Sequence, residues 1–143
     1  MTEVAFHFNV PDKVAYACRL LRKVLRRNAQ VGVNGAPELM DLLDKALWTL
    51  APHEFLPHCR ASAAPALLAA SPIVLAAPGE PVPHQDVLVN LGDGVPAGFG
   101  RFARLIEVVS RDDMDDRARA RLRWKHYADR GYALVKHDLV LEG

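Results

Sequence analysis

The chain has little of what several common classes of protein depend on. It holds two cysteines in 143 residues, Cys18 and Cys59, which are too few for a disulfide framework and do not form a CxxC pair. Its first residues lack the basic segment and apolar run of a secretory signal. The formal net charge is +1, from 18 Lys and Arg against 17 Asp and Glu, so bulk charge does not favour nucleic-acid binding. These absences predict a reduced, cytoplasmic protein.

The size and composition predict a single globular domain over residues 1–143. Half of the residues are hydrophobic and 24% are charged, which is ordinary for a folded domain with a hydrophobic core. Residues 61–79 carry no charge and are long enough for a membrane span, but Pro65, Pro72 and Pro78 interrupt them. Because alanines also insert weakly, we expect a loop, a short helical piece and a buried strand, with no membrane contact.

The motifs of common active sites are also missing. No P-loop, G-x-S-x-G elbow or H-E-x-x-H helix occurs. The glycine-rich loop 92–100 contains a G-x-G-x-x-A spacing, but the next strand follows too soon for a crossover helix and Pro96 removes an amide donor, so a plain turn is favoured. His53, His58 and Cys59 lie close together without a fourth zinc ligand at standard spacing. We therefore predict neither a cofactor nor a metal.

Apolar periodicity divides the chain into alternating strands and helices. We predict strands at 3–10, 30–33, 73–77, 86–91, 105–109 and 132–141, and helices at about 12–27, 37–48 and 111–130. Seven of the ten prolines lie between residues 52 and 83, where we expect mostly loop. Strands that alternate with helices and are apolar throughout are typical of an α/β sheet with helices on both faces.

The last helix carries the most distinctive surface. At 100° per residue, one row at four-residue spacing is predicted to pack on the sheet: Met114, Ala118 and Leu122. Three cations and an indole share the neighbouring quarter turn: Arg117, Arg121, Trp124 and Lys125. Such a ridge suits an acidic peptide, a phosphate backbone or a stacked base. The alternative is a solvated helix end whose positive charges match the helix dipole.

Several segments together resemble a known family. LDKALW at 43–48 is followed by HEFLPH at 53–58, and further along come DVLVNL at 86–91, Phe102, and a helix ending at Gly131 in the pattern R-x-x-W-K-x-Y-x-x-x-G. In order and spacing these segments are similar to those of the chi subunit family of bacterial DNA polymerase III. That family has an LDxxLW helix end followed by an F-x-P-H segment.

The resemblance implies a fold and a function. It implies a Rossmann-like sandwich with a mostly parallel central sheet and no working nucleotide site. It implies a non-enzymatic accessory subunit of the clamp-loader complex that binds the psi subunit, where the organism has one, through one surface. Through another surface it would bind the C-terminal tail of single-stranded DNA-binding protein, which ends in aspartates followed by Ile-Pro-Phe. Contact with DNA would then be indirect.

The resemblance also implies roles for individual residues. Arg121 would bind the terminal carboxylate of the tail, Arg117 and Lys125 would form a basic shoulder, and Trp124 occupies a position usually held by an aromatic residue. Trp48 and Phe55 are candidates for the apolar pocket, with core packing as the alternative for both. Two other functions stay open: a small α/β nucleotide-binding enzyme that uses the loop 92–100, and a direct binder of single-stranded DNA that uses Trp124 and the arginines.

Overall fold

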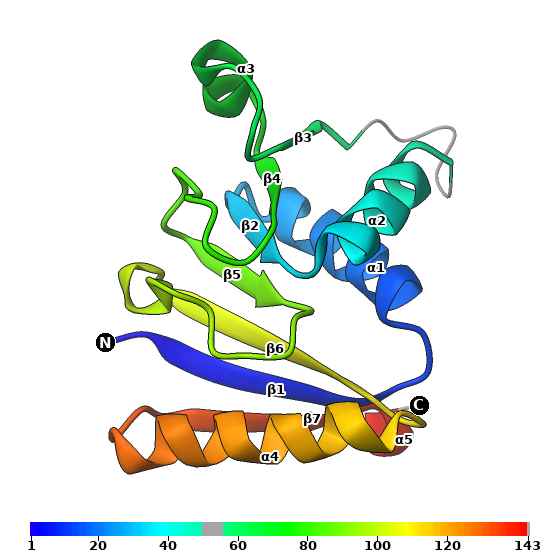
Figure 1. Ribbon diagram of the computed structural model, residues 1–143, viewed down its shortest axis with the longest axis vertical. Coiled ribbons are helices and arrows are strands. Elements are labelled where there is room, and N and C mark those ends of the chain that lie inside the picture. The colour runs from blue at the N-terminus through cyan, green and yellow to red at the C-terminus, as the bar shows by residue number, and fades with distance from the viewer. Residues whose placement is uncertain (50–55, 143) are drawn as a thin grey trace.

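One seven-stranded sheet organises the molecule. The computed structural model describes residues 1–49 and 56–142, and orders the strands β3-β4-β2-β5-β6-β1-β7 (Figure 1). The strands are β1 (Glu3–Val10), β2 (Val31–Asn34), β3 (His58–Arg60), β4 (Ile73–Ala76), β5 (Val87–Asn90), β6 (Arg104–Ser110) and β7 (Leu134–Asp138). The helices are α1 (Lys13–Arg26), α2 (Pro37–Thr49), α3 (Pro65–Ala70), α4 (Met114–Asp129) and α5 (Leu139–Glu142), with a 3-10 turn η1 (Phe99–Arg101).

Every strand pairing in the sheet is parallel, which confirms the predicted α/β class. Parallel neighbours need crossover connections, and these place helices on both faces of the sheet. Figure 1 shows α4 beside the β7 end of the sheet and α3 beyond the β3 end. The strand β3 was not predicted, because three residues within a proline-rich segment give no periodic signal.

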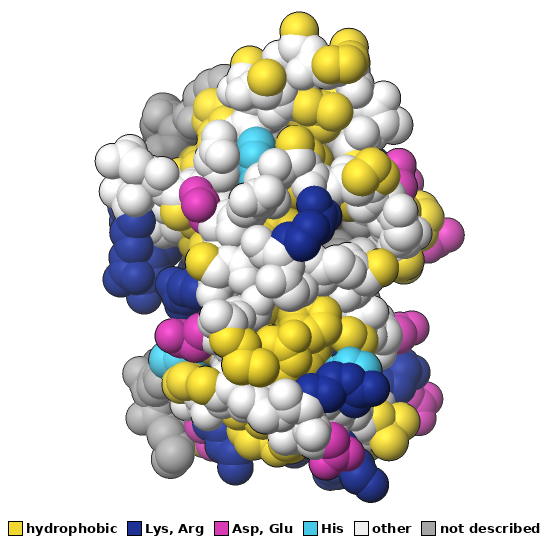
Figure 2. Space-filling model, turned by 90° about the vertical axis from the view of Figure 1, so that its left-hand side faces the viewer, with side chains coloured by type: hydrophobic (Ala, Val, Ile, Leu, Met, Phe, Trp, Pro, Cys, Tyr) yellow, Lys and Arg dark blue, Asp and Glu magenta, His cyan; other side chains and the backbone are white. Residues whose placement is uncertain are grey.

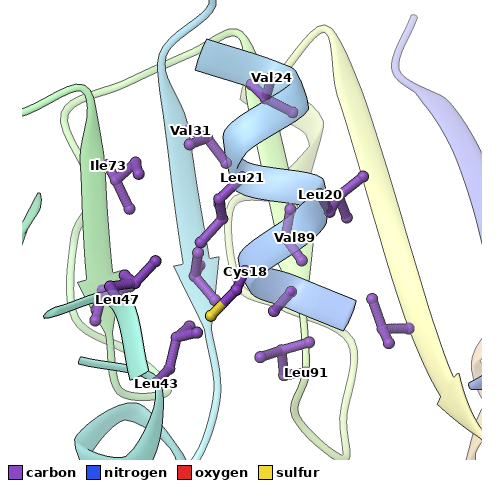
Figure 3. Close-up of a cluster of buried hydrophobic side chains, with 14 of the residues drawn as sticks. Cys18, Leu20, Leu21, Val24, Val31, Leu43, Leu47, Ile73, Val89 and Leu91 are labelled. Atoms are coloured by element: carbon purple, nitrogen blue, oxygen red, sulfur yellow. The ribbon is translucent and has the colours of Figure 1, made fainter. Parts of the chain in front are cut away.

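The first core lies on the face of the sheet that α1 and α2 cover. Asp12 caps α1 by accepting a hydrogen bond from the Ala15 amide at 3.1 Å. Leu21 on α1 and Leu43 on α2 are completely buried, and Figure 3 shows them pointing toward strand residues of β2 and β4. Burial of aliphatic side chains of this size contributes about 1.5–3 kcal/mol each.

The second core lies on the opposite face, under α4. Alternate residues of the same strands supply it, such as Val74 and Leu88, because successive side chains on a strand point to opposite faces. Phe6 on β1 and Tyr127 on α4 also belong to this core, and their ring centroids lie 6.0 Å apart. Both faces of the strands are therefore buried, as the uninterrupted apolar runs predict.

The charge-free segment forms what its composition predicts. It contains the short helix α3 followed by the fully buried strand β4. No side chain of α3 is fully buried, and Leu67 is 51% exposed. Figure 2 shows hydrophobic side chains at the surface of the uppermost part of the molecule, where α3 lies in Figure 1. Within residues 1–49 and 56–142, no helix is long and apolar enough to cross a membrane.

The glycine-rich loop 92–100 is a turn, as predicted. Between β5 and β6, a connection that the structure describes completely, the only helical turn is the three-residue η1. A pyrophosphate site of the dinucleotide-binding type needs the N-terminus of a crossover helix at this point. This connection does not supply one.

One buried histidine makes the stability of the fold depend on pH. His7 on β1 is 8% exposed, its Nδ1 is hydrogen-bonded to the Tyr16 hydroxyl, and its ring centroid lies 4.5 Å from that of His137. Burial, together with the nearby charges of His137, Arg104 and Lys23, lowers the pKa of His7 to about 4. The folded chain therefore holds His7 neutral at pH values where the unfolded chain protonates it.

We expect the free energy of unfolding to fall as pH drops from about 6.5 toward 4, because the unfolded state then binds a proton that the folded state does not. The loss from this residue should be about 1 kcal/mol between pH 6 and pH 5. Urea unfolding of the wild-type chain and of His7→Gln at both pH values measures it. Equal pH dependence of the two proteins would contradict the prediction.

Candidate functional site

The helix α4 begins with a strong N-terminal cap. The Asp113 carboxylate accepts hydrogen bonds from the amides of Asp115 and Asp116 at 3.0 and 3.1 Å. Asp115 and Asp116 also place negative charge in the first turn, where the helix dipole stabilises it. The helix ends before Gly131, whose φ of 79° suits the left-handed residue that commonly follows a helix.

The face of α4 that packs on the sheet differs from the predicted one. Met114 is 67% exposed and Leu122 is 71% exposed, so the row of Met114, Ala118 and Leu122 does not face the core. The buried residues of the helix are Asp116, Ala120, Arg123 and Tyr127. Asp116, Arg123 and Tyr127 carry polar groups, so a prediction based on hydrophobicity alone placed the wrong side of the helix against the sheet.

A buried polar cluster explains this orientation. Glu107 on β6 is fully buried and pairs with Arg123 at 3.0 Å between Oε1 and Nε. Its carboxylate also accepts a hydrogen bond from the Tyr127 hydroxyl at 2.6 Å and one from the Asn90 amide at 2.9 Å. A buried carboxylate is very costly without such partners. The helix must therefore turn Arg123 and Tyr127 toward the sheet.

The same cluster holds the glycine-rich loop. Arg123 donates a hydrogen bond to the carbonyl of Asp93 at 2.7 Å, and Asn90 donates one to the carbonyl of Gly94 at 3.0 Å. Burial raises the pKa of Glu107, while the guanidinium of Arg123 and the hydrogen bonds to the carboxylate act against that shift. Burial and the adjacent carboxylate raise the pKa of Tyr127 as well, so its hydroxyl stays a donor.

A second polar contact fixes the first turns of α4. Asp116 is buried and forms an ion pair with Lys13 of α1 at 2.8 Å. Its other carboxylate oxygen accepts a hydrogen bond from the amide of Ser110, at the end of β6, at 2.8 Å. Both ends of the helix are thus held by polar contacts at defined positions, which fixes its rotation about its own axis.

This rotation creates a groove between α4 and the sheet, which we call the α4 groove. Its volume is about 360 Å³. It is lined by Phe6, Phe8, Val109, Arg117, Ala120, Arg121, Trp124 and Lys136. The residues come from β1, β6, β7 and α4, so the groove combines an apolar floor with a rim of three cations.

The apolar part of the α4 groove is largely aromatic. The rings of Phe6 and Trp124 pack edge to face with centroids 5.0 Å apart. Trp124 is half-buried and packs against the second core, and the Lys136 ammonium lies 5.1 Å from the centroid of its indole. The indole therefore forms one wall of the groove.

The cations of the rim differ in how firmly they are held. Arg117 is half-buried and donates hydrogen bonds to Asn9 Oδ1 at 3.0 Å and to the carbonyl of Arg111 at 3.2 Å. Arg121 is exposed, and no described residue forms an ion pair or hydrogen bond with its guanidinium. A guanidinium without a partner at the mouth of an apolar groove is suited to bind a carboxylate from outside the chain.

The structure brings three of the predicted site residues together and places two others, Lys125 and Trp48, outside their groove. Arg117, Arg121 and Trp124 line the α4 groove, whereas Lys125 is exposed further around the helix and does not line it. Trp48 lies near the end of α2, on the other face of the sheet, and its ring is tilted against that of His58 with centroids 4.8 Å apart. It is 58% exposed, so it is not packed in the core, and it does not line the α4 groove. Phe55 lies outside the described residues.

Sequence reasoning missed the residues that the sheet contributes to the groove. Phe6 and Phe8 share one face of β1 because they are two residues apart, and Lys136 enters from the neighbouring strand β7. The strand pattern was visible in the sequence. The strand order, which sets β1 beside β6 and β7, was not visible. Without it, the sequence could not show that these side chains lie next to α4.

The Glu107–Arg123 pair allows a test of what holds α4. We expect Glu107→Leu to lower the free energy of unfolding by about 3–5 kcal/mol, because it leaves the Arg123 charge buried without a partner. The double variant Glu107→Leu/Arg123→Met should recover at least half of that loss, since it removes the second charge as well. Urea unfolding measures both, and a double variant no more stable than the single one would refute the explanation.

Comparisons with known proteins agree with this architecture. Residues 1–135 match the family described as DNA polymerase III chi subunit, HolC. A relative from Haemophilus influenzae, named DNA polymerase III subunit chi, is 29% identical over 125 residues, which cover 86% of this chain and 85% of that protein. The chain belongs to the chi subunit family of DNA polymerase III, a family of polymerase accessory subunits with a role in DNA replication.

Proposed function

We propose that this chain links the clamp-loader complex of DNA polymerase III to single-stranded DNA-binding protein by binding the acidic C-terminal tail of that protein in the α4 groove. The observation that carries the proposal is the presence of three cations around an apolar, aromatic groove. No catalytic step is assigned to the chain, and contact with DNA is indirect. We propose the cytoplasm as the location of this role.

The terminal phenylalanine of the tail has an apolar side chain and a free carboxylate, and the α4 groove suits both. A terminal phenylalanine needs an apolar recess, which Phe6, Phe8 and Val109 supply. Its free carboxylate needs a charge-assisted donor, and the exposed guanidinium of Arg121 lies at the mouth of the groove. Recognition of a C-terminus by pocket and cation together is an established mode of peptide binding.

The aspartates that precede the terminal residues match the rest of the rim. Arg117 and Lys136 line the groove on opposite sides, one from α4 and one from β7. Lys125, although outside the groove, lies one turn beyond Arg121 on the exposed side of the helix and extends the positive surface. We assign these three cations to the acidic part of the tail.

A short tail that makes few contacts binds modestly, with a Kd on the order of micromolar. Modest affinity is sufficient for a tether, because a coated DNA strand presents many tails and the effective concentration is high. We assign the attachment to the clamp loader, including the psi subunit where the organism has one, to other surfaces of the chain.

We expect Arg121→Ala to weaken binding of a tail peptide by about tenfold or more while leaving the fold intact, because the guanidinium is exposed and has no partner among the described residues. A titration followed by Trp124 fluorescence measures the affinity. The control is Lys45→Ala, which removes one exposed positive charge from α2 on the other face of the sheet. Equal affinities for the two variants would contradict the assignment.

The same titration separates the alternative functions. A peptide without its final phenylalanine should bind much more weakly, since it cannot fill the apolar recess. A dT oligonucleotide that bound the chain alone, and lost affinity with Arg121→Ala, would favour direct binding of single-stranded DNA instead. A rise in melting temperature with nucleotides or dinucleotides would favour the nucleotide-binding enzyme.

We expect tail binding to weaken as salt rises. The charge pairs form at a solvent-accessible rim, where the Debye length falls from about 10 Å at 0.1 M to about 3 Å at 1 M. Raising NaCl from 0.05 M to 0.3 M should weaken binding roughly threefold or more in the wild-type chain, and less in Arg117→Ala. Salt-independent affinity would mean that the cations of the rim do not contact the tail.

A further inference from the structure

A second groove lies on the opposite face of the sheet, between α1 and the C-terminal elements β7 and α5. Its volume is about 760 Å³, roughly twice that of the α4 groove. Side chains of α1 and of the central strands give it an aliphatic lining: Leu20, Val24, Val87 and Ile106. Leu139 and Val140 of α5 line the side away from α1, and Val140 is 65% exposed. We call it the α1 groove.

Positive charge surrounds this aliphatic lining. Arg19 and Lys23 are four residues apart on one face of α1, and Arg27, the residue that caps its C-terminal end, continues this row. Arg104 on β6 also lines the groove. Among the described residues, no Asp or Glu lines the groove, and the side chains of Lys23, Arg27 and Arg104 have no hydrogen bond or ion pair.

Within residues 1–49 and 56–142, four of the five cations that line the groove form no ion pair. Arg111, a fifth lining cation, is the exception because it pairs with Asp112 at 3.0 Å. Arg104 and Lys23 both act on His7, which lies in the same groove, and help to lower its pKa. Unpaired cations that repel one another across a groove favour a negatively charged occupant.

We propose that the α1 groove binds an acidic, amphipathic helix of a partner protein. Acidic side chains one turn apart on that helix would face the row of Arg19, Lys23 and Arg27, because both helices repeat at the same spacing. The apolar face of the helix would lie on Leu20, Val24 and Ile106, the helix-in-groove mode of recognition. This site is separate from the α4 groove and does not depend on the function proposed for it.

The lining favours a polypeptide over a nucleic acid. Single-stranded nucleic acids bind by stacking their bases on free aromatic faces. In the α1 groove the Tyr16 hydroxyl is hydrogen-bonded to His7, and the guanidinium of Arg19 lies 5.7 Å from the centroid of its ring. The rest of the lining between the cations is largely aliphatic, which suits leucine-type side chains.

The test uses a fluorescein-labelled peptide of 18 residues made only of glutamate and leucine, with the leucines on one helical face. By fluorescence anisotropy we expect the full chain to bind it with a Kd on the order of 10–100 µM. Lys23→Glu should weaken binding about fivefold or more. Arg26→Glu is the matched control, because it makes the same charge change in the same last turn of α1 but does not line the groove.

Two further controls locate the site and its chemistry. Arg121→Ala should leave peptide binding unchanged, which separates this groove from the α4 groove. A peptide of the same composition with its leucines spread around the helix should bind about fivefold more weakly or worse, since it has no apolar face. Far-ultraviolet circular dichroism of each variant checks that the fold is kept.

Four outcomes would overturn the proposal. One is no binding of the amphipathic peptide, and another is equal loss of affinity in Lys23→Glu and Arg26→Glu. Tighter binding of a dT oligonucleotide that depends on Lys23 would make the groove a nucleic-acid site. Self-association in sedimentation velocity that Lys23→Glu abolishes would make a second copy of the chain its occupant.

Discussion

The buried carboxylate of Glu107 is the constraint on which the arrangement of this molecule depends. It is fully enclosed, and it is satisfied only when Arg123 and Tyr127 of α4 and Asn90 of β5 all reach it. If the interface were apolar throughout, the helix could rotate about its own axis at little cost in free energy, because hydrophobic contact is not directional. A carboxylate with three donors at 2.6–3.0 Å fixes the rotation. Arg117, Arg121 and Trp124 face the groove as a consequence, so the geometry of the surface is set by a contact in the interior.

The sheet separates two surfaces of related chemistry. The α4 groove has an aromatic wall and a rim that includes one unpaired arginine, which suits the end of a chain. The α1 groove is larger and aliphatic, with a row of cations at helical spacing, which suits the side of a helix. Because parallel strands expose alternate residues to each face, β1 and β6 contribute to both grooves: Phe6 and Val109 to one, His7 and Ile106 to the other. A chain with a net charge of only +1 thus concentrates positive charge at two places on opposite faces.

The fold was predictable where its signals are local. Strand β1 has the predicted bounds, and α2 begins at Pro37 as predicted. Strand β4 is one residue shorter than predicted at its end, and β6 is one residue longer than predicted at each end. The arc of α4 that holds Arg117, Arg121 and Trp124 was also predictable, because helical spacing is fixed. The buried flank of α4 could not be predicted, because Arg123 and Asp116 are buried by partners on β6 and α1 that no local pattern reveals. The exposed position of Trp48 was missed for a related reason: an aromatic at a helix end gives no sign of which side the core lies on.

The polar cluster also occupies the edge of the sheet at which open α/β sheets commonly bind their ligands. In open α/β sheets, ligands bind outside the carboxyl ends of the strands, where loop amides and carbonyls are free. Here the side chains of the protein itself occupy those groups: Asn90 accepts from the Gly92 amide, and Arg123 donates to the Asp93 carbonyl. Asn34, Asn90 and Glu107 are register partners on three adjacent strands, so this polar row runs across the sheet at that edge. With these loop groups already satisfied from within, the two grooves are the places where described cations such as Arg121 and Lys23 lie without an ion pair.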